Sequence, residues 1–105
     1  MKAITSHQEF NAVIQQDKPV LLDFYADWCG PCQMLTPTIE KIAKEFEGKV
    51  EVRKINIDEN KEIAAKFKVR SIPTLFFVKE GKIYETINGL TSDVTVRKKL
   101  NKLLK

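Results

Sequence analysis

The sequence predicts a single α/β domain over residues 1–105, in which a central mixed β-sheet is flanked by helices on both faces. Segments with the apolar pattern of strands alternate with segments whose apolar residues recur every three or four positions. Strand and helix alternate in the first half, which favours parallel pairing, whereas a tight turn between the last two strands favours a hairpin. At 105 residues, 43% of them hydrophobic, the chain suits one ordinary core.

A short amphipathic helix is expected to open the domain and to end near Lys18–Pro19. Ser6 and Glu9 have the spacing of a capping box, in which each side chain binds the backbone near the other. The apolar residues that follow at helical spacing are Phe10, Val13 and Ile14. Residues 20–26 are then almost continuously apolar, as in a central strand covered on both faces. Asp23 is the exception in this strand.

A long helix and a second strand are expected next. After Cys32 the apolar residues recur at helical spacing until Gly48 offers a stop. These residues are Leu35, Ile39, Ile42, Ala43 and Phe46. Residues 50–57 form the strand, and because side chains alternate along a strand, Lys54 lies on the same apolar face as Val52.

The last third predicts a short helix, a hairpin and a final helix. The short helix starts at about Asn60, and the apolar strand 75–78 follows it. A turn leads into the half-exposed strand 83–87, which Gly89 ends. The final helix starts at about Ser92. In open sheets of this kind, ligands bind beyond the carboxyl ends of the central strands, and the chain's two cysteines fall at such a position.

Composition argues against a membrane protein and a nucleic-acid-binding protein. No run approaches the roughly 18 apolar residues that span a bilayer, and the first residues turn polar too soon for a signal peptide, so we expect a cytoplasmic protein. We also expect it to be a monomer. Lys and Arg exceed Asp and Glu by 18 to 14. The basic residues near the end share their segment with apolar ones, which favours a solvated helix face over a nucleic-acid contact.

Cys29 and Cys32 allow three interpretations: half of a zinc site, a structural crosslink, or a redox dithiol. A structural zinc site needs four ligands, but the chain has no third cysteine and its one histidine is His7 in the first helix. A structural disulfide here would close a loop too short to constrain the unfolded chain much. The redox interpretation is therefore favoured.

The neighbours of the cysteines support redox chemistry. Cys29 falls at the cap of the long helix and Pro31 at its first position, so backbone N–H groups and the helix dipole would favour a thiolate at Cys29. An exposed Cys29 with a lowered pKa would attack disulfides near neutral pH. Cys32 lies one turn further in, where a sheltered thiol could resolve the mixed disulfide.

Asp23 is the candidate proton acceptor for Cys32. Burial in an apolar strand disfavours the carboxylate and raises its pKa toward the range of a general base. Lys54 is its candidate partner, because the strand pattern places Lys54 on an apolar face. The alternative is an Asp23–Lys54 ion pair that serves only the fold.

The run from Asp23 to Cys32, with Pro37 behind it and Ile72-Pro73-Thr74 and Gly89 downstream, resembles the thioredoxin family over essentially the whole chain. The resemblance implies a thioredoxin-like fold with Cys29 as nucleophile, Cys32 as resolving thiol, and Asp23 with Lys54 handling the proton. It also implies a cis peptide at Pro73 and a groove that docks an extended client segment. The groove residues would be Trp28, Gly30, Pro31, Ile72, Pro73, Gly89 and Leu90.

The same resemblance implies a protein disulfide reductase that needs no bound cofactor. Its partners would be disulfide-containing client proteins and a thioredoxin reductase. Two rivals stay open: an oxidant or isomerase, and a binding module in which the cysteines are spectators. Without the resemblance, Trp28 would be a core residue, Gly89 a turn and Pro73 the start of a strand. Tyr25 departs from the family, which more often has tryptophan there.

Overall fold

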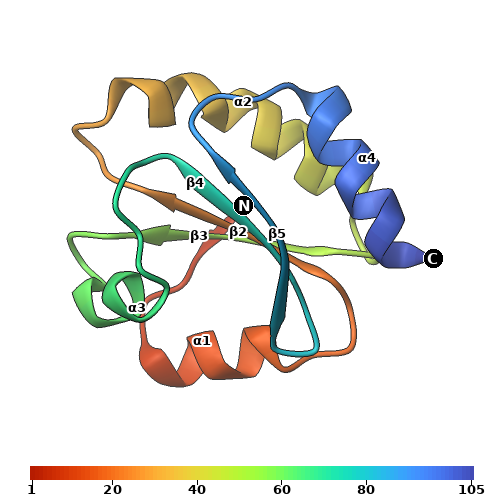
Figure 1. The fold of residues 1–105 in the computed structure, drawn as a ribbon, viewed down its shortest axis with the longest axis horizontal. Coiled ribbons are helices and arrows are strands. Elements are labelled where there is room, and N and C mark those ends of the chain that lie inside the picture. The colour runs from red at the N-terminus through yellow and green to blue at the C-terminus, as the bar shows by residue number, and fades with distance from the viewer.

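The computed structural model describes residues 1–105 as a five-stranded sheet between two pairs of helices (Figure 1). The strands are β1 (Lys2–Ala3), β2 (Val20–Tyr25), β3 (Glu51–Asn56), β4 (Thr74–Lys79) and β5 (Lys82–Asn88). The helices are α1 (His7–Ile14), α2 (Gly30–Glu45), α3 (Lys61–Lys66) and α4 (Asp93–Leu104). None of the helices combines the length and the apolar character that crossing a bilayer requires.

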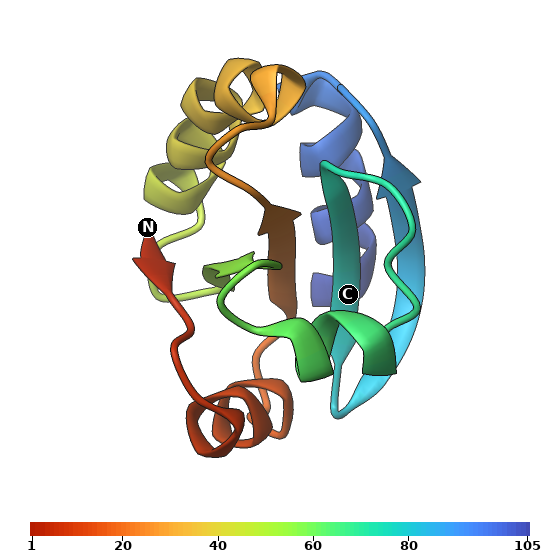
Figure 2. The same cartoon turned by 90° about the vertical axis from the view of Figure 1, so that its left-hand side faces the viewer.

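The sheet is mixed, as predicted, and its strand order is β1-β3-β2-β4-β5. β3 pairs in parallel with both β1 and β2, whereas β4 runs antiparallel to β2 and β5 antiparallel to β4. α2 and α4 cover one face of the sheet, and α1 and α3 cover the other (Figures 1 and 2). The central strand β2 is therefore covered on both sides, which explains its continuous apolar run.

Each face of the sheet carries its own apolar core. Between the sheet and the α2–α4 pair lie Leu21 and Phe77 from the strands with Ile39 and Leu100 from the helices. The opposite core is rich in aromatic rings whose centroids lie 5.0 to 5.5 Å apart, mostly edge to face, a favourable arrangement for rings. These rings belong to Phe10, Phe24, Phe67 and Phe76.

The helices expected to begin near Ser6 and Ser92 do so, with one change in the first cap. The Ser6 hydroxyl accepts the Glu9 N–H at 3.1 Å, but the Glu9 carboxylate reaches the N–H of Thr5 and not that of Ser6. Ser92 caps α4 by accepting the N–H of Thr95. The predicted turn of the hairpin has positive φ at both Glu80 and Gly81, which matches the twist of the two strands it joins.

The clearest departures from the sequence prediction lie in the first third of the chain. The domain opens with the two-residue strand β1 and not with a helix. α1 ends at Ile14, well before Pro19, because residues 15–18 supply no apolar side chain that could continue the buried face. α2 begins at Gly30, so Pro31 is its second residue and not its first.

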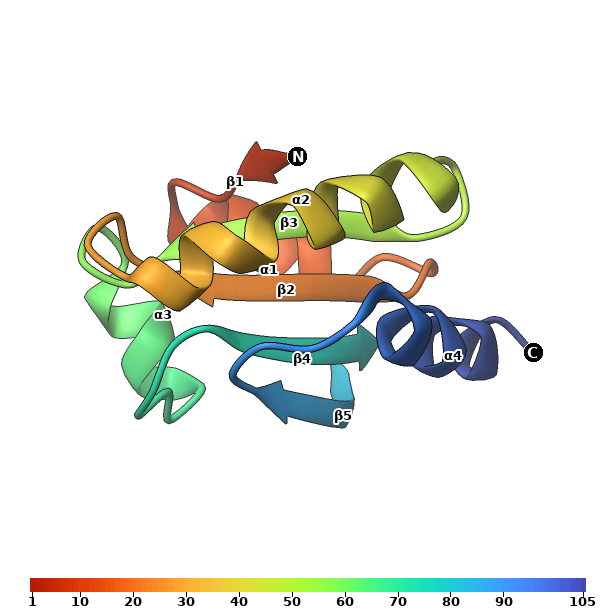
Figure 3. The same ribbon diagram turned by 90° about the horizontal axis from the view of Figure 1, so that it is seen from above.

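The chain enters α2 directly beyond the carboxyl end of β2. Figure 3 shows the end of β2, the start of α2 and the region of α3 at the same side of the molecule. The two cysteines lie at this end, where an open sheet of this kind binds its ligands.

Candidate functional site

Cys29 and Cys32 form a disulfide at the first turn of α2. Cys29 is the cap residue, and its sulfur accepts the backbone N–H of Cys32 at 3.2 Å. The two Cα atoms are 5.3 Å apart, a usual separation for bonded cysteines. No group of three or more His, Cys, Asp or Glu side chains lies together in the structure, so the further ligands that a zinc site needs do not lie beside these cysteines. The backbone N–H and the positive end of the helix both stabilise negative charge on the Cys29 sulfur.

Both cysteines are more enclosed than the sequence indicated. Cys32 is 3% exposed, as expected for a sheltered thiol, but Cys29 is only 5% exposed, so the expectation of an exposed Cys29 is wrong for this disulfide form. Ala26 packs with the two cysteines, and Tyr25 and Ile72 lie around them. A client disulfide must therefore approach Cys29 along a restricted direction.

Asp23 is buried in the middle of β2, with 4% of its surface exposed. Burial raises the pKa of its carboxyl to about 6, and the positive charge of Lys54 opposes part of that rise. Its Oδ1 atom has no hydrogen-bond partner. The raised pKa agrees with the sequence prediction and places the carboxyl in the range of a base that works near neutral pH.

A cavity of about 180 Å³ links Asp23 to the resolving cysteine. Asp23 and Cys32 both line it, so the carboxyl and the second sulfur border the same small space. The volume is enough for several water molecules, and the walls are largely polar. The complete lining is Met1, Asp23, Tyr25, Asp27, Cys32, Gln33, Thr36 and Lys54.

Lys54 lies beside Asp23 but does not pair with it. The two residues are direct partners in the parallel register of β2 and β3. No Asp23–Lys54 contact lies among the ion pairs within 4.0 Å, so the interpretation of a fold-stabilising ion pair is wrong. The Lys54 ammonium instead lies 5.3 Å from the centre of the Tyr25 ring, in the range of a cation–π contact.

Of the residues expected to dock a client, Trp28 adjoins Cys29 in the chain and Ile72 packs against the two cysteines. Trp28 is 71% exposed, so its alternative as a core residue is wrong. Trp28 and Ile72 both line a groove of about 310 Å³, together with Ile57, Val69, Arg70 and Ser71. Gly30 and Pro31 are exposed at the start of α2.

Pro73 and Gly89 form the backbone beside this groove. The Ile72–Pro73 peptide is cis, as the resemblance implied, and Pro73 itself is buried. The N–H of Gly89 donates to the carbonyl of Pro73 at 2.8 Å, so the two loops are joined. Leu90 follows with half of its surface exposed. Gly89 and Leu90 do not line the groove itself.

Two residues near Trp28 were missed in the sequence. Asp58 accepts a hydrogen bond from the Trp28 indole N–H at 2.8 Å and fixes the ring. Arg70 lines the groove, is exposed, and makes no ion pair. The position of Asp58 just beyond the carboxyl end of β3 was a usable signal, since functional residues gather at such ends.

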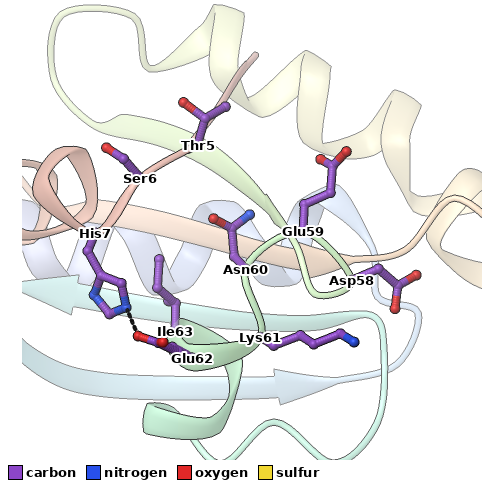
Figure 4. A pocket seen from close by; sticks show the side chains of 9 residues that line it. All are labelled: Thr5, Ser6, His7, Asp58, Glu59, Asn60, Lys61, Glu62 and Ile63. Carbon is purple, nitrogen blue, oxygen red and sulfur yellow. Dashed lines mark ion pairs between the residues drawn. The ribbon is translucent and has the colours of Figure 1, made fainter.

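A larger hollow of about 380 Å³ lies between the start of α1 and the segment that leads into α3 (Figure 4). His7 and Glu62 meet in it at 3.0 Å, and both side chains are well exposed. It contains no cysteine and only one apolar residue. Its lining is Thr5, Ser6, His7, Asp58, Glu59, Asn60, Lys61, Glu62 and Ile63. Without a sulfur atom, this hollow does not share in the disulfide chemistry.

The chain is similar to known thioredoxins in both sequence and structure. The sequence model of the family Thioredoxin matches residues 1–102. The chain is 49% identical over 90 residues to a thioredoxin of Rickettsia felis, which covers 86% of each chain. It is 47% identical over 92 residues to a thioredoxin of Porphyra purpurea, covering 88% of this chain and 86% of that one. A solved structure of Malassezia sympodialis thioredoxin superposes with a TM-score of 0.91 at 33% identity, covering 99% of this chain and 90% of the other.

Proposed function

Since the chain belongs to the thioredoxin family, we propose that it is a protein disulfide reductase, which passes two electrons from its own dithiol to disulfides in client proteins. Membership of the thioredoxin family itself establishes the general type of activity. The chain is a thiol–disulfide oxidoreductase with a thioredoxin fold, and Cys29–Cys32 is its redox-active disulfide. The observation that carries the proposal is the Cys29 sulfur at the start of α2, bonded to Cys32 and accepting its N–H.

In the proposed reaction, the Cys29 thiolate attacks one sulfur of the client disulfide. The client S–S bond breaks, one client sulfur leaves as a thiolate, and the other stays bonded to Cys29. The Cys32 thiolate then attacks the Cys29 sulfur. The second client sulfur leaves as a thiolate while the Cys29–Cys32 bond forms, so the client gains two electrons and the protein loses two.

Cys32 must lose a proton before its attack, and Asp23 is the proposed acceptor. The shared cavity supports this role, because water in it can relay the proton from the Cys32 thiol to the Asp23 carboxylate. The pKa of about 6 means that Asp23 is largely ionised at neutral pH yet still able to return the proton to a departing client thiolate. Lys54 would keep a positive charge at the wall of the cavity, and this charge favours the ionised form of Asp23 that accepts the proton.

Client docking is proposed for the groove that Trp28 and Ile72 line. An extended client segment could bury apolar side chains there while its disulfide meets Cys29. We further propose that a thioredoxin reductase restores the dithiol, and that the protein works as a monomer in the cytoplasm. A reducing role suits that compartment, where thiols are kept reduced.

A turnover assay tests this function. The protein, NADPH and a thioredoxin reductase are mixed with insulin as the client, and loss of NADPH is followed. Cys29→Ser should abolish turnover, and Cys32→Ser should hold the client on Cys29 as a mixed disulfide visible by mass spectrometry. Full activity of Cys29→Ser would refute the proposal.

A second measurement separates the reductase from an oxidant or isomerase. The reduction potential of the Cys29–Cys32 pair is measured by equilibration with glutathione. A reductase should have a potential of roughly −270 mV, as thioredoxin itself does. A potential near that of the strongly oxidising disulfide donors, roughly −120 mV, would favour the oxidant instead.

A further inference from the structure

We propose that Tyr25 is a positioning residue: its ring holds the Lys54 ammonium at the wall of the Asp23 cavity and so sets the charge that Asp23 meets during disulfide exchange. This inference rests on the proposed role of Asp23.

The strands bring the three side chains together. Asp23 and Tyr25 are two residues apart on β2, so their side chains leave the same face of the sheet. Lys54 is the direct neighbour of Asp23 on β3. All three residues line the same cavity. The Lys54 ammonium lies 5.3 Å from the centre of the Tyr25 ring.

The Tyr25 ring stabilises the Lys54 ammonium at the wall of the cavity. A lysine side chain is long, flexible and strongly hydrated, so a half-buried ammonium with no carboxylate partner tends to leave for water. The negative face of an aromatic ring opposes this tendency. Held at the cavity wall, the charge acts on Asp23 through poorly screening surroundings, whereas in bulk water it would be screened.

The other ionisable groups around the cavity do not replace Lys54. Asp27 is exposed and negatively charged, so its charge would disfavour the ionised form of Asp23, whereas the charge of Lys54 favours it. Cys32 is bonded to Cys29 in the oxidised protein and does not titrate there. Met1 also lines the cavity, with an uncharged side chain. Lys54 is the cation that faces Asp23 from the neighbouring strand.

The test is a titration of the Asp23 carboxyl by carbon NMR in the oxidised protein. Tyr25→Phe keeps the ring, and the pKa of Asp23 should stay within about 0.2 unit. Tyr25→Leu removes the ring but stays apolar, and the pKa should rise by about 0.5 unit as Lys54 withdraws. Lys54→Met should raise it at least as much. In the Lys54→Met background, Tyr25→Leu should add nothing.

Three results would overturn the inference. An unchanged pKa in Tyr25→Leu would show that the ring does not place the charge. A lower pKa would show that the ring keeps Lys54 away from Asp23. A rise that persists in the Lys54→Met background would show that Tyr25 acts on Asp23 without the lysine. A chemical-shift map of each variant confirms that the fold is intact.

The same variants give a kinetic readout. In the reduced protein, the pH at which resolution of the mixed disulfide becomes half-maximal should move up in Tyr25→Leu and not in Tyr25→Phe. The NMR titration uses the oxidised protein and needs no client, so its failure leaves disulfide reduction untouched. A pH profile of turnover that does not change in Asp23→Asn would count against the proposed function instead.

Discussion

The buried carboxyl of Asp23 should make the stability of the protein fall as the pH rises through the slightly acidic range. Asp23→Asn is the informative change, because the amide keeps the shape of the side chain and removes its charge. In the unfolded chain the carboxyl ionises near 3.8, but in the folded protein only near 6. Between these values the unfolded state loses its proton first, so rising pH favours unfolding.

The magnitude follows from the two pKa values. Raising the pKa from 3.8 to about 6 costs the folded state about 3 kcal/mol once the carboxylate is ionised, at about 1.4 kcal/mol per pH unit. The protonated Asp23 carboxyl contributes its full stabilisation of the folded state below pH 3.8. This contribution to the free energy of unfolding is lost as the pH rises through about 6. Between pH 4 and pH 8 the unchanged protein should lose about 2.4 kcal/mol relative to Asp23→Asn.

The assay is urea unfolding of the disulfide-intact proteins at pH 4, 5, 6, 7 and 8, followed by circular dichroism. Any fixed cost of burying the substituted amide is the same at every pH and cancels when the difference between the two proteins is compared across pH. Asp17→Asn is the matched control, because Asp17 is exposed and makes no ion pair. It should change stability by less than about 0.5 kcal/mol throughout.

A stability difference between Asp23→Asn and the unchanged protein that stays constant from pH 4 to pH 8 would refute this reasoning. A loss of stability in Asp23→Asn relative to the unchanged protein as the pH rises would be the opposite of the expected trend. Either result would mean that the folded protein does not raise the pKa of Asp23, and the proposed proton acceptor would lose its physical basis.

Three further predictions test other parts of the structure. Ser92→Ala removes the cap of α4 and should lower the free energy of unfolding by about 1 kcal/mol, measured in urea. Gly89→Ala should cost about 1 kcal/mol from the φ of 90° alone, since no atom lies within 4 Å of the added Cβ, whereas Gly30→Ala should be nearly neutral. Asp58→Ala frees the Trp28 indole and should lower kcat/KM for a protein client several-fold with little change for a small disulfide.

Local signals in the sequence predicted much of the fold. Ser6 and Ser92 start helices because their hydroxyls bind backbone N–H groups three residues away, a short-range effect that sequence displays directly. Gly81 marks the hairpin through an equally local effect, the positive φ of the turn. The sequence did not predict β1, because a strand of two residues shows no periodic pattern. Its pairing with β3 also depends on residues some fifty positions further along the chain.

In the functional site, too, some features were predictable from local sequence and others were not. The capping position of Cys29 and the burial of Asp23 follow from neighbours in the chain, and both were predictable. The enclosure of Cys29, the bond from Trp28 to Asp58 and the place of Lys54 over an aromatic ring depend on side-chain directions across separate elements. Such directions are set by tertiary packing, and residue spacing does not contain them.

The most direct test of the whole account is a competition between the two thiols. The reduced protein is treated at neutral pH with less than one equivalent of iodoacetamide, and peptide mass spectrometry measures the label on each cysteine. Label should collect on Cys29 at least about tenfold faster than on Cys32, because thiolates react and the start of α2 favours the Cys29 thiolate. Equal labelling, or faster labelling of Cys32, would contradict the assignment of Cys29 as the attacking sulfur.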